Sequence, residues 1–163
     1  MLDKITTTRT AAIITLVAFA TIAGAWIFEA FGYLPCELCL KQRIAYYIGV
    51  PLAVVTTLLA SKNIPAARAL LYASALLWFG SALFGVYHSG VEWGFWPGPT
   101  ACTGSGASAS DMDMFMKQLQ TTQVVQCDKV AIRIFGLSLA GWNAVISAGM
   151  SALAFVGARA KEA

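Results

Sequence analysis

Charged residues are scarce in this chain of 163 residues. Only 12% of the residues are charged, whereas a soluble domain usually carries about 25%. Together with a mean hydropathy of +0.69, this excludes an ordinary soluble domain. The net charge of +3 is too small and too scattered to form the basic surface that binds nucleic acid. No internal repeat is evident, so we expect one integral membrane domain over residues 1–163.

The sequence contains long runs of apolar residues. A helix that spans a bilayer needs about 20 predominantly apolar residues. Four runs approach or reach that length, at about residues 11–31, 44–60, 69–87 and 135–157. Pro51 interrupts the second run, which a membrane helix in a bundle tolerates. The sequence therefore predicts an all-α protein, a bundle of four transmembrane helices.

The first run has a competing interpretation as a signal peptide. Lys4 and Arg9 precede it, and "AGA" at residues 23–25 is similar to a cleavage site. The run is longer than the apolar region of a signal peptide and continues past that point, which favours a membrane span.

Two loops on one side of the membrane hold the cysteines, at about residues 32–43 and 88–134. An even number of spans puts both termini on the other side of the membrane. That side carries six lysine and arginine residues, and the side with the cysteines carries five. The excess of basic residues predicts cytoplasmic termini. Cysteine pairs outside the membrane suit an oxidising compartment such as the bacterial periplasm. We therefore expect a multi-pass protein of the bacterial inner membrane.

The four cysteines, Cys36, Cys39, Cys102 and Cys127, have three possible uses. A zinc site of four thiolates is disfavoured, because the second pair lacks C-x-x-C spacing and the periplasm favours oxidation, so no metal site is expected. Structural disulfides are a second use, and closing the loop between Cys102 and Cys127 would contribute about 3.5 kcal/mol. The small Cys36–Cys39 ring would constrain almost nothing, so redox chemistry is the third and favoured use.

The surroundings of "LPCELCLKQR" fit a reactive dithiol. Lys41 and Arg43 follow the cysteines directly, at the expected start of the second helix. Positive charge and a helix N-terminus both lower the pKa of a thiol. We therefore predict a thiolate at Cys39.

The long loop carries two further features. Trp93, Phe95 and Trp96 are aromatic residues of a kind that favours the membrane interface. After a Gly/Ser-rich linker, apolar residues from Met112 to Leu119 fall on one helical face. They predict a short helix that lies on the membrane surface or packs against protein.

Several motifs together resemble a known family. "PCELCLKQR", the second cysteine pair, "WPGPTAC" and "FGLSLAGWN" at the fourth span are similar to the bacterial disulfide bond formation protein B family, DsbB. The resemblance implies a thiol oxidase that re-oxidises a periplasmic, thioredoxin-fold protein of the DsbA type. The electrons would pass to a membrane quinone, either ubiquinone or menaquinone.

The resemblance also implies roles for individual residues. Cys102 would form the mixed disulfide with the partner protein, Cys127 would then attack Cys36, and Cys39 would pass electrons to the quinone. Cys36–Cys39 and Cys102–Cys127 would be separate disulfides at rest. Arg43 would bind a quinone carbonyl, and His88 and Trp96 are further candidates for quinone contact. Gln42 differs from the best-known members, which carry an acid before the arginine.

Two other functions stay open at this point. One is a sibling thiol oxidase dedicated to a single client protein. The other is a non-catalytic assembly factor with four spans, whose cysteines only brace its loops.

Overall fold

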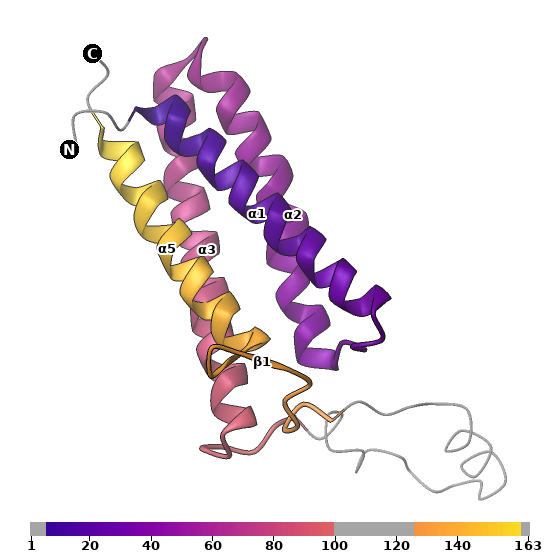
Figure 1. Ribbon diagram of the computed structural model, residues 1–163. Coiled ribbons are helices and arrows are strands. Elements are labelled where there is room, and N and C mark those ends of the chain that lie inside the picture. The colour runs from indigo at the N-terminus through magenta and orange to yellow at the C-terminus, as the bar shows by residue number, and fades with distance from the viewer. Residues whose placement is uncertain (1–5, 100–125, 161–163) are drawn as a thin grey trace, which may run out of the picture.

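The computed structural model describes residues 6–99 and 126–160. Within these residues, four long helices form a bundle (Figure 1): α1 (Thr7–Ala30), α2 (Glu37–Ala60), α3 (Ile64–Glu92) and α5 (Leu139–Arg159). All four are long and apolar enough to cross a membrane. The prediction of an all-α, multi-pass membrane bundle is confirmed. The predicted surface helix near residues 112–119 lies outside the described residues.

The helices α2 and α3 reach further toward the cysteine side than the apolar runs do. Helix α2 begins at Glu37 because the sulfur of Cys36 caps its N-terminus, accepting a hydrogen bond from the backbone N–H of Cys39. Helix α3 continues to Glu92. Residues 88–92, which the sequence places in the long loop, are therefore helical, and α2 begins at Glu37, slightly ahead of the start that the sequence predicts.

A small β-hairpin precedes α5 and was not predicted. Strands β1 (Arg133–Ile134) and β2 (Leu137–Ser138) pair in antiparallel fashion. Phe135 and Gly136 connect them with φ values of 51° and 85°, and positive φ at both central residues is the signature of a type I′ turn. Helix α5 thus begins at Leu139, not near residue 135, with Ser138 as its cap.

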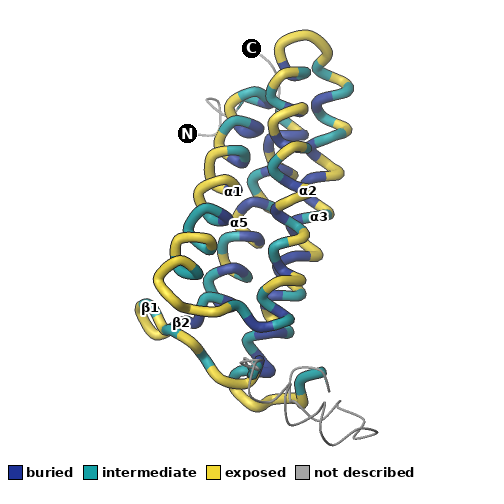
Figure 2. The backbone as a smooth tube through the Cα atoms, turned by 90° about the vertical axis from the view of Figure 1, so that its right-hand side faces the viewer, coloured by how far each residue is buried: buried dark blue, intermediate teal, exposed yellow. Residues whose placement is uncertain are grey.

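Small residues allow the helices to approach closely. A Cβ atom added to Gly85 of α3 would lie 2.9 Å from the backbone of Ala144 in α5, so the two helices pack here through small residues, as membrane helices commonly do. Trp78, fully buried, fills the centre against Tyr46. Buried residues line the inside of the bundle and exposed residues cover its outside (Figure 2). Large apolar side chains such as Leu16 and Leu76 are exposed there, as expected of a surface that faces lipid.

Polar contacts also join the helices. The Tyr46 hydroxyl donates to Asn143 Oδ1 over 2.6 Å, which links α2 to α5. At one end of the bundle the Thr7 hydroxyl donates to the Gly157 carbonyl over 3.3 Å. The α1–α2 connection and the hairpin lie at the opposite end (Figure 1).

Candidate functional site: a dithiol between two cavities

Cys36 and Cys39 lie at the N-terminus of α2, as free thiols. The Sγ atoms are 2.8 Å apart and joined by a hydrogen bond. The backbone N–H of Cys39 donates to Cys36 Sγ over 3.2 Å. The structure thus shows the dithiol form of the pair, and the resting Cys36–Cys39 disulfide stays a prediction.

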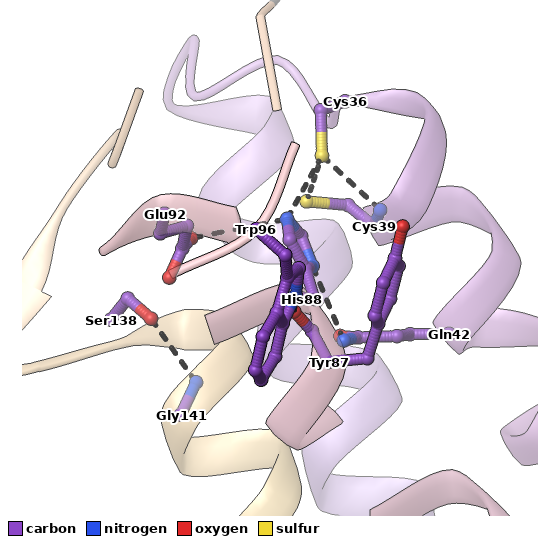
Figure 3. Close-up of polar contacts among 9 residues, drawn as sticks. All are labelled: Cys36, Cys39, Gln42, Tyr87, His88, Glu92, Trp96, Ser138 and Gly141. Atoms are coloured by element: carbon purple, nitrogen blue, oxygen red, sulfur yellow. Dashed lines mark hydrogen bonds and ion pairs between the residues drawn. The ribbon is translucent and has the colours of Figure 1, made fainter. Parts of the chain in front are cut away.

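A histidine from α3 connects Cys36 to a glutamine of α2 (Figure 3). His88 Nε2 lies 3.5 Å from Cys36 Sγ, and Gln42 Nε2 lies 3.2 Å from His88 Nδ1. An amide nitrogen can only donate, so His88 Nδ1 accepts and its proton resides on Nε2. That proton faces the sulfur of Cys36. His88 is 1% exposed, so water does not compete for these contacts.

These contacts decide which cysteine is ionised. The hydrogen bond with the Cys39 sulfur lowers the pKa of the Cys36 thiol to about 4, and His88 contributes in the same direction, while burial opposes both. The helix N-terminus adds its partial positive charge at the same sulfur. In this dithiol form the ionised sulfur is therefore that of Cys36, so the prediction of a thiolate at Cys39 is wrong for the reduced pair. The sequence argument missed that Cys36 is the residue that caps α2.

Arg43 has a partner from another helix. Its Nη1 atom lies 2.5 Å from Glu29 Oε2 of α1, and its Nη2 donates to the Ala25 carbonyl over 3.4 Å. The Arg43 side chain is 11% exposed and that of Glu29 is 41% exposed. Glu29 thus holds Arg43 against α1.

A cavity of about 390 Å³ lies beside Cys39 and Arg43. Ligand pockets of proteins commonly enclose about 300–1,000 Å³. Helices α1, α2 and α5 and residues 131–134 enclose this cavity with mainly apolar side chains, among them Phe28, Tyr33 and Trp142. It has the size and the surface to hold an apolar ring compound.

Cys39 borders two cavities. It lines the large cavity, and it also lines a second cavity of about 40 Å³ with Cys36, His88 and Glu92. Cys36 lines the small cavity and is absent from the wall of the large one. The pair therefore has one sulfur turned toward the apolar cavity and one turned away from it.

The second cysteine pair reaches this site through Cys127. Cys127 is 1% exposed and is disulfide-bonded. It belongs to one buried cluster with Cys36, Leu38 and Val91. The other predicted catalytic cysteine, Cys102, lies outside the described residues.

The two further candidates for quinone contact lie away from the large cavity. His88 lines the small cavity instead. Trp96 stacks on Tyr87 with an interplanar angle of 5°, and its Nε1 donates to the Tyr87 carbonyl over 2.8 Å (Figure 3). Neither residue is part of the large cavity's wall.

Sequence reasoning missed Gln42 and Glu92 as parts of the site. Gln42 lines the large cavity and binds His88, and Glu92 Oε1 lies 3.9 Å from His88 Nε2. The sequence spacing of these two residues could have indicated that they belong to the site. Gln42 follows Cys39 by three positions and Glu92 follows His88 by four, which puts each beside its neighbour on one helical face.

The geometry of the site also permits a metal ion. One ligand atom each from Cys36, Cys39 and His88 lie within 4.8 Å of one another. Thiolate and imidazole are the ligands that zinc prefers in proteins.

Comparison with known proteins identifies the family. The sequence pattern of "Disulfide bond formation protein DsbB" matches residues 7–157, which implies a role in disulfide bond formation. The chain is also similar to "Uncharacterized protein RP370" of Rickettsia prowazekii (strain Madrid E), with 24% identity over 138 residues, or 83% of this chain and 78% of that protein. No solved structure matches the chain significantly. The protein belongs to the disulfide bond formation protein DsbB family.

Proposed function

We propose that the protein is a thiol:quinone oxidoreductase that re-oxidises a periplasmic, thioredoxin-fold protein of the DsbA type. The position of Cys39 carries this proposal. A dithiol that transfers electrons from a protein to a quinone must offer one sulfur to each, and Cys39 borders the apolar cavity while Cys36 belongs to one buried cluster with Cys127. The quinone, either ubiquinone or menaquinone, would occupy the large cavity beside Arg43.

The electrons would travel through two disulfide exchanges. A thiolate of the reduced partner attacks Cys102 of the Cys102–Cys127 disulfide and forms a mixed disulfide, which the partner's second thiol resolves. Freed Cys127 attacks Cys36 of a Cys36–Cys39 disulfide and releases the Cys39 thiolate. Two electrons and two protons leave the partner's thiols in the full cycle, and they appear on the quinol.

The redox potentials require an acceptor beyond the cysteines. A partner of the DsbA type has a reduction potential of about −120 mV, and each 30 mV corresponds to about 1.4 kcal/mol for two electrons. An ordinary structural disulfide lies below about −300 mV, so it cannot accept these electrons. A quinone supplies the driving force, and the apolar cavity gives it access to Cys39 from the bilayer.

Quinone reduction tests the proposal directly. Purified protein, mixed with a reduced DsbA-type partner and ubiquinone, should lower the quinone absorbance with turnover. Cys39→Ser should abolish this while a disulfide between Cys102 and the partner still forms. Normal turnover of Cys39→Ser would refute the order of transfer, and inactive wild-type protein would favour a non-catalytic assembly factor.

We also propose that the cysteine end faces the periplasm. In a variant whose own cysteines are replaced by Ser, Tyr33→Cys and Lys62→Cys would mark the two ends of the bundle. A membrane-impermeant thiol reagent should label the Tyr33→Cys protein in intact spheroplasts and the Lys62→Cys protein only after lysis. The reverse pattern would refute this topology.

A further inference from the structure

We propose that the reduced Cys36–Cys39 pair, together with His88 and Glu92, binds a thiophilic divalent cation such as Zn²⁺, and that the bound ion prevents disulfide formation. This donor set differs from the four-cysteine site that the sequence disfavours, because it uses one cysteine pair and two residues of α3. The proposal does not depend on quinone reduction, because it concerns the reduced protein alone.

Four donor groups converge at the junction of α2 and α3 (Figure 3). The ligand atoms of Cys36, Cys39 and His88 lie within 4.8 Å of one another. Glu92 Oε1 lies 3.9 Å from His88 Nε2, and the Glu92 side chain is 8% exposed. Its second oxygen, Oε2, is buried and makes no hydrogen bond within the usual distance to the described residues, although the Ser138 side chain lies close enough to favour the charged carboxylate. A buried carboxylate oxygen without a partner is costly, and a cation would satisfy it.

The distances suit tetrahedral zinc after one small movement. With Zn–S bonds of about 2.3 Å and Zn–N bonds of about 2.0 Å, tetrahedral angles put sulfur and nitrogen about 3.5 Å apart and two sulfurs about 3.8 Å apart. Cys36 Sγ and His88 Nε2 already lie 3.5 Å apart. For Nε2 to bind the ion, its proton moves to Nδ1, and the Gln42 amide turns so that its oxygen accepts from Nδ1. The two sulfurs, now 2.8 Å apart, would separate by about 1 Å, which a change in the side-chain torsion of Cys39 achieves.

Space and charge at the site both favour a cation. The four donors line the cavity of about 40 Å³, and a cavity needs only about 10–15 Å³ to admit a water-sized particle. Two thiolates and a carboxylate around a divalent cation leave one net negative charge. Lys129 lines the same cavity and offsets that charge.

Metal binding and disulfide formation exclude each other. Binding converts the Cys36 thiolate and the Cys39 thiol into metal thiolates and releases the Cys39 proton, without any change of oxidation state. A disulfide has no thiolate to offer, so only the reduced pair binds. The bound ion also engages a lone pair of each sulfur, which lowers the nucleophilicity of Cys36 until the ion leaves.

Cobalt titration tests the site without reference to catalysis. The sample is the protein in detergent with the substitutions Cys102→Ser and Cys127→Ser, reduced by a phosphine. It is titrated with Co²⁺. Cobalt thiolate complexes absorb in the near ultraviolet, and tetrahedral cobalt complexes also absorb visible light. We expect one Co²⁺ per chain and displacement by Zn²⁺. His88→Ala and Glu92→Gln should each raise the Kd for Co²⁺ at least about tenfold. Even the loss of a residue that only hydrogen-bonds to a metal ligand typically weakens metal binding by about that factor.

A neighbouring acid provides the matched control. Glu37 precedes the site on α2 and pairs with Lys41, so Glu37→Gln should leave the Kd unchanged. An absence of thiolate-to-cobalt absorption, or equal Kd values for Glu92→Gln and Glu37→Gln, would overturn the four-ligand site. If the double cysteine variant does not fold, reduced wild-type protein compared with Cys36→Ser gives the same decision, because the absorption must disappear in Cys36→Ser.

Discussion

Replacing Arg43 by Gln should weaken quinone binding more than it weakens the fold. The Arg43 side chain is 11% exposed and lines the large cavity, so a hydrogen bond from its guanidinium to a quinone carbonyl forms largely out of water. Hydrogen bonds to charged groups contribute about 1.5–3 kcal/mol. At 1.36 kcal/mol per factor of ten, Arg43→Gln should raise the quinone KM by about 10- to 150-fold.

The ion pair with Glu29 contributes little to this effect. Glu29 is 41% exposed, so it regains water when Arg43 is lost, and such pairs contribute at most about 1 kcal/mol to stability. Arg43→Gln should therefore fold. Arg43→Lys should retain part of the quinone affinity, because it keeps the charge but loses the planar fork. Glu29→Gln, which removes the ion pair and keeps Arg43, is the control and should leave the KM within a few-fold of wild type.

Steady-state kinetics with varied quinone and a saturating reduced partner separates these outcomes. Thermal unfolding in detergent, measured on the same samples, verifies that each variant is folded. An unchanged quinone KM in folded Arg43→Gln protein would mean that Arg43 only anchors α2 at the interface, and the quinone contact would have to be sought elsewhere in the cavity.

Two further predictions follow from the site and from the packing. Alkylation of reduced Cys36, followed by mass spectrometry, should proceed at a nearly constant rate from about pH 8 down to about pH 5, because a pKa of about 4 keeps the sulfur ionised over that range. An ordinary thiol with a pKa of about 8.5 would slow about tenfold per pH unit, and that behaviour would contradict the assignment. Gly85→Val should lower the free energy of unfolding by about 1–3 kcal/mol, because its Cβ would lie 2.9 Å from the backbone of Ala144. Gly80→Ala should leave the free energy of unfolding unchanged, because open space surrounds Gly80.

The sequence was sufficient for the parts of the structure that depend on local chemistry. Apolar runs of membrane-spanning length predict the four helices, and C-x-x-C beside basic residues predicts the dithiol. The apolar run of α2 begins only near residue 44 because charged residues precede it, whereas the helix itself begins at Glu37, where Cys36 caps it. The hairpin was missed because Phe135 and Gly136 open an apolar run and were therefore assigned to the span.

The contacts of His88 could not be predicted in the same way. His88 meets Gln42 and Cys36 across 46 and 52 positions of sequence, and these contacts exist only because α3 packs beside α2 at one particular rotation. The same holds for the ion pair between Glu29 and Arg43. Periodicity places a residue on a helical face, but it does not tell which residue of another helix faces it.

The burial of Cys127 in one cluster with Cys36 has a kinetic consequence. A thiolate and a disulfide held within one packed cluster react as if at a high effective concentration, and well-oriented intramolecular reactions reach about 10⁵ M or more. Exchange with a dilute soluble protein has no such advantage. If the proposed relay operates, the encounter with the partner therefore limits the rate below saturation, and turnover should rise linearly with partner concentration while the internal transfer stays invisible in the steady state.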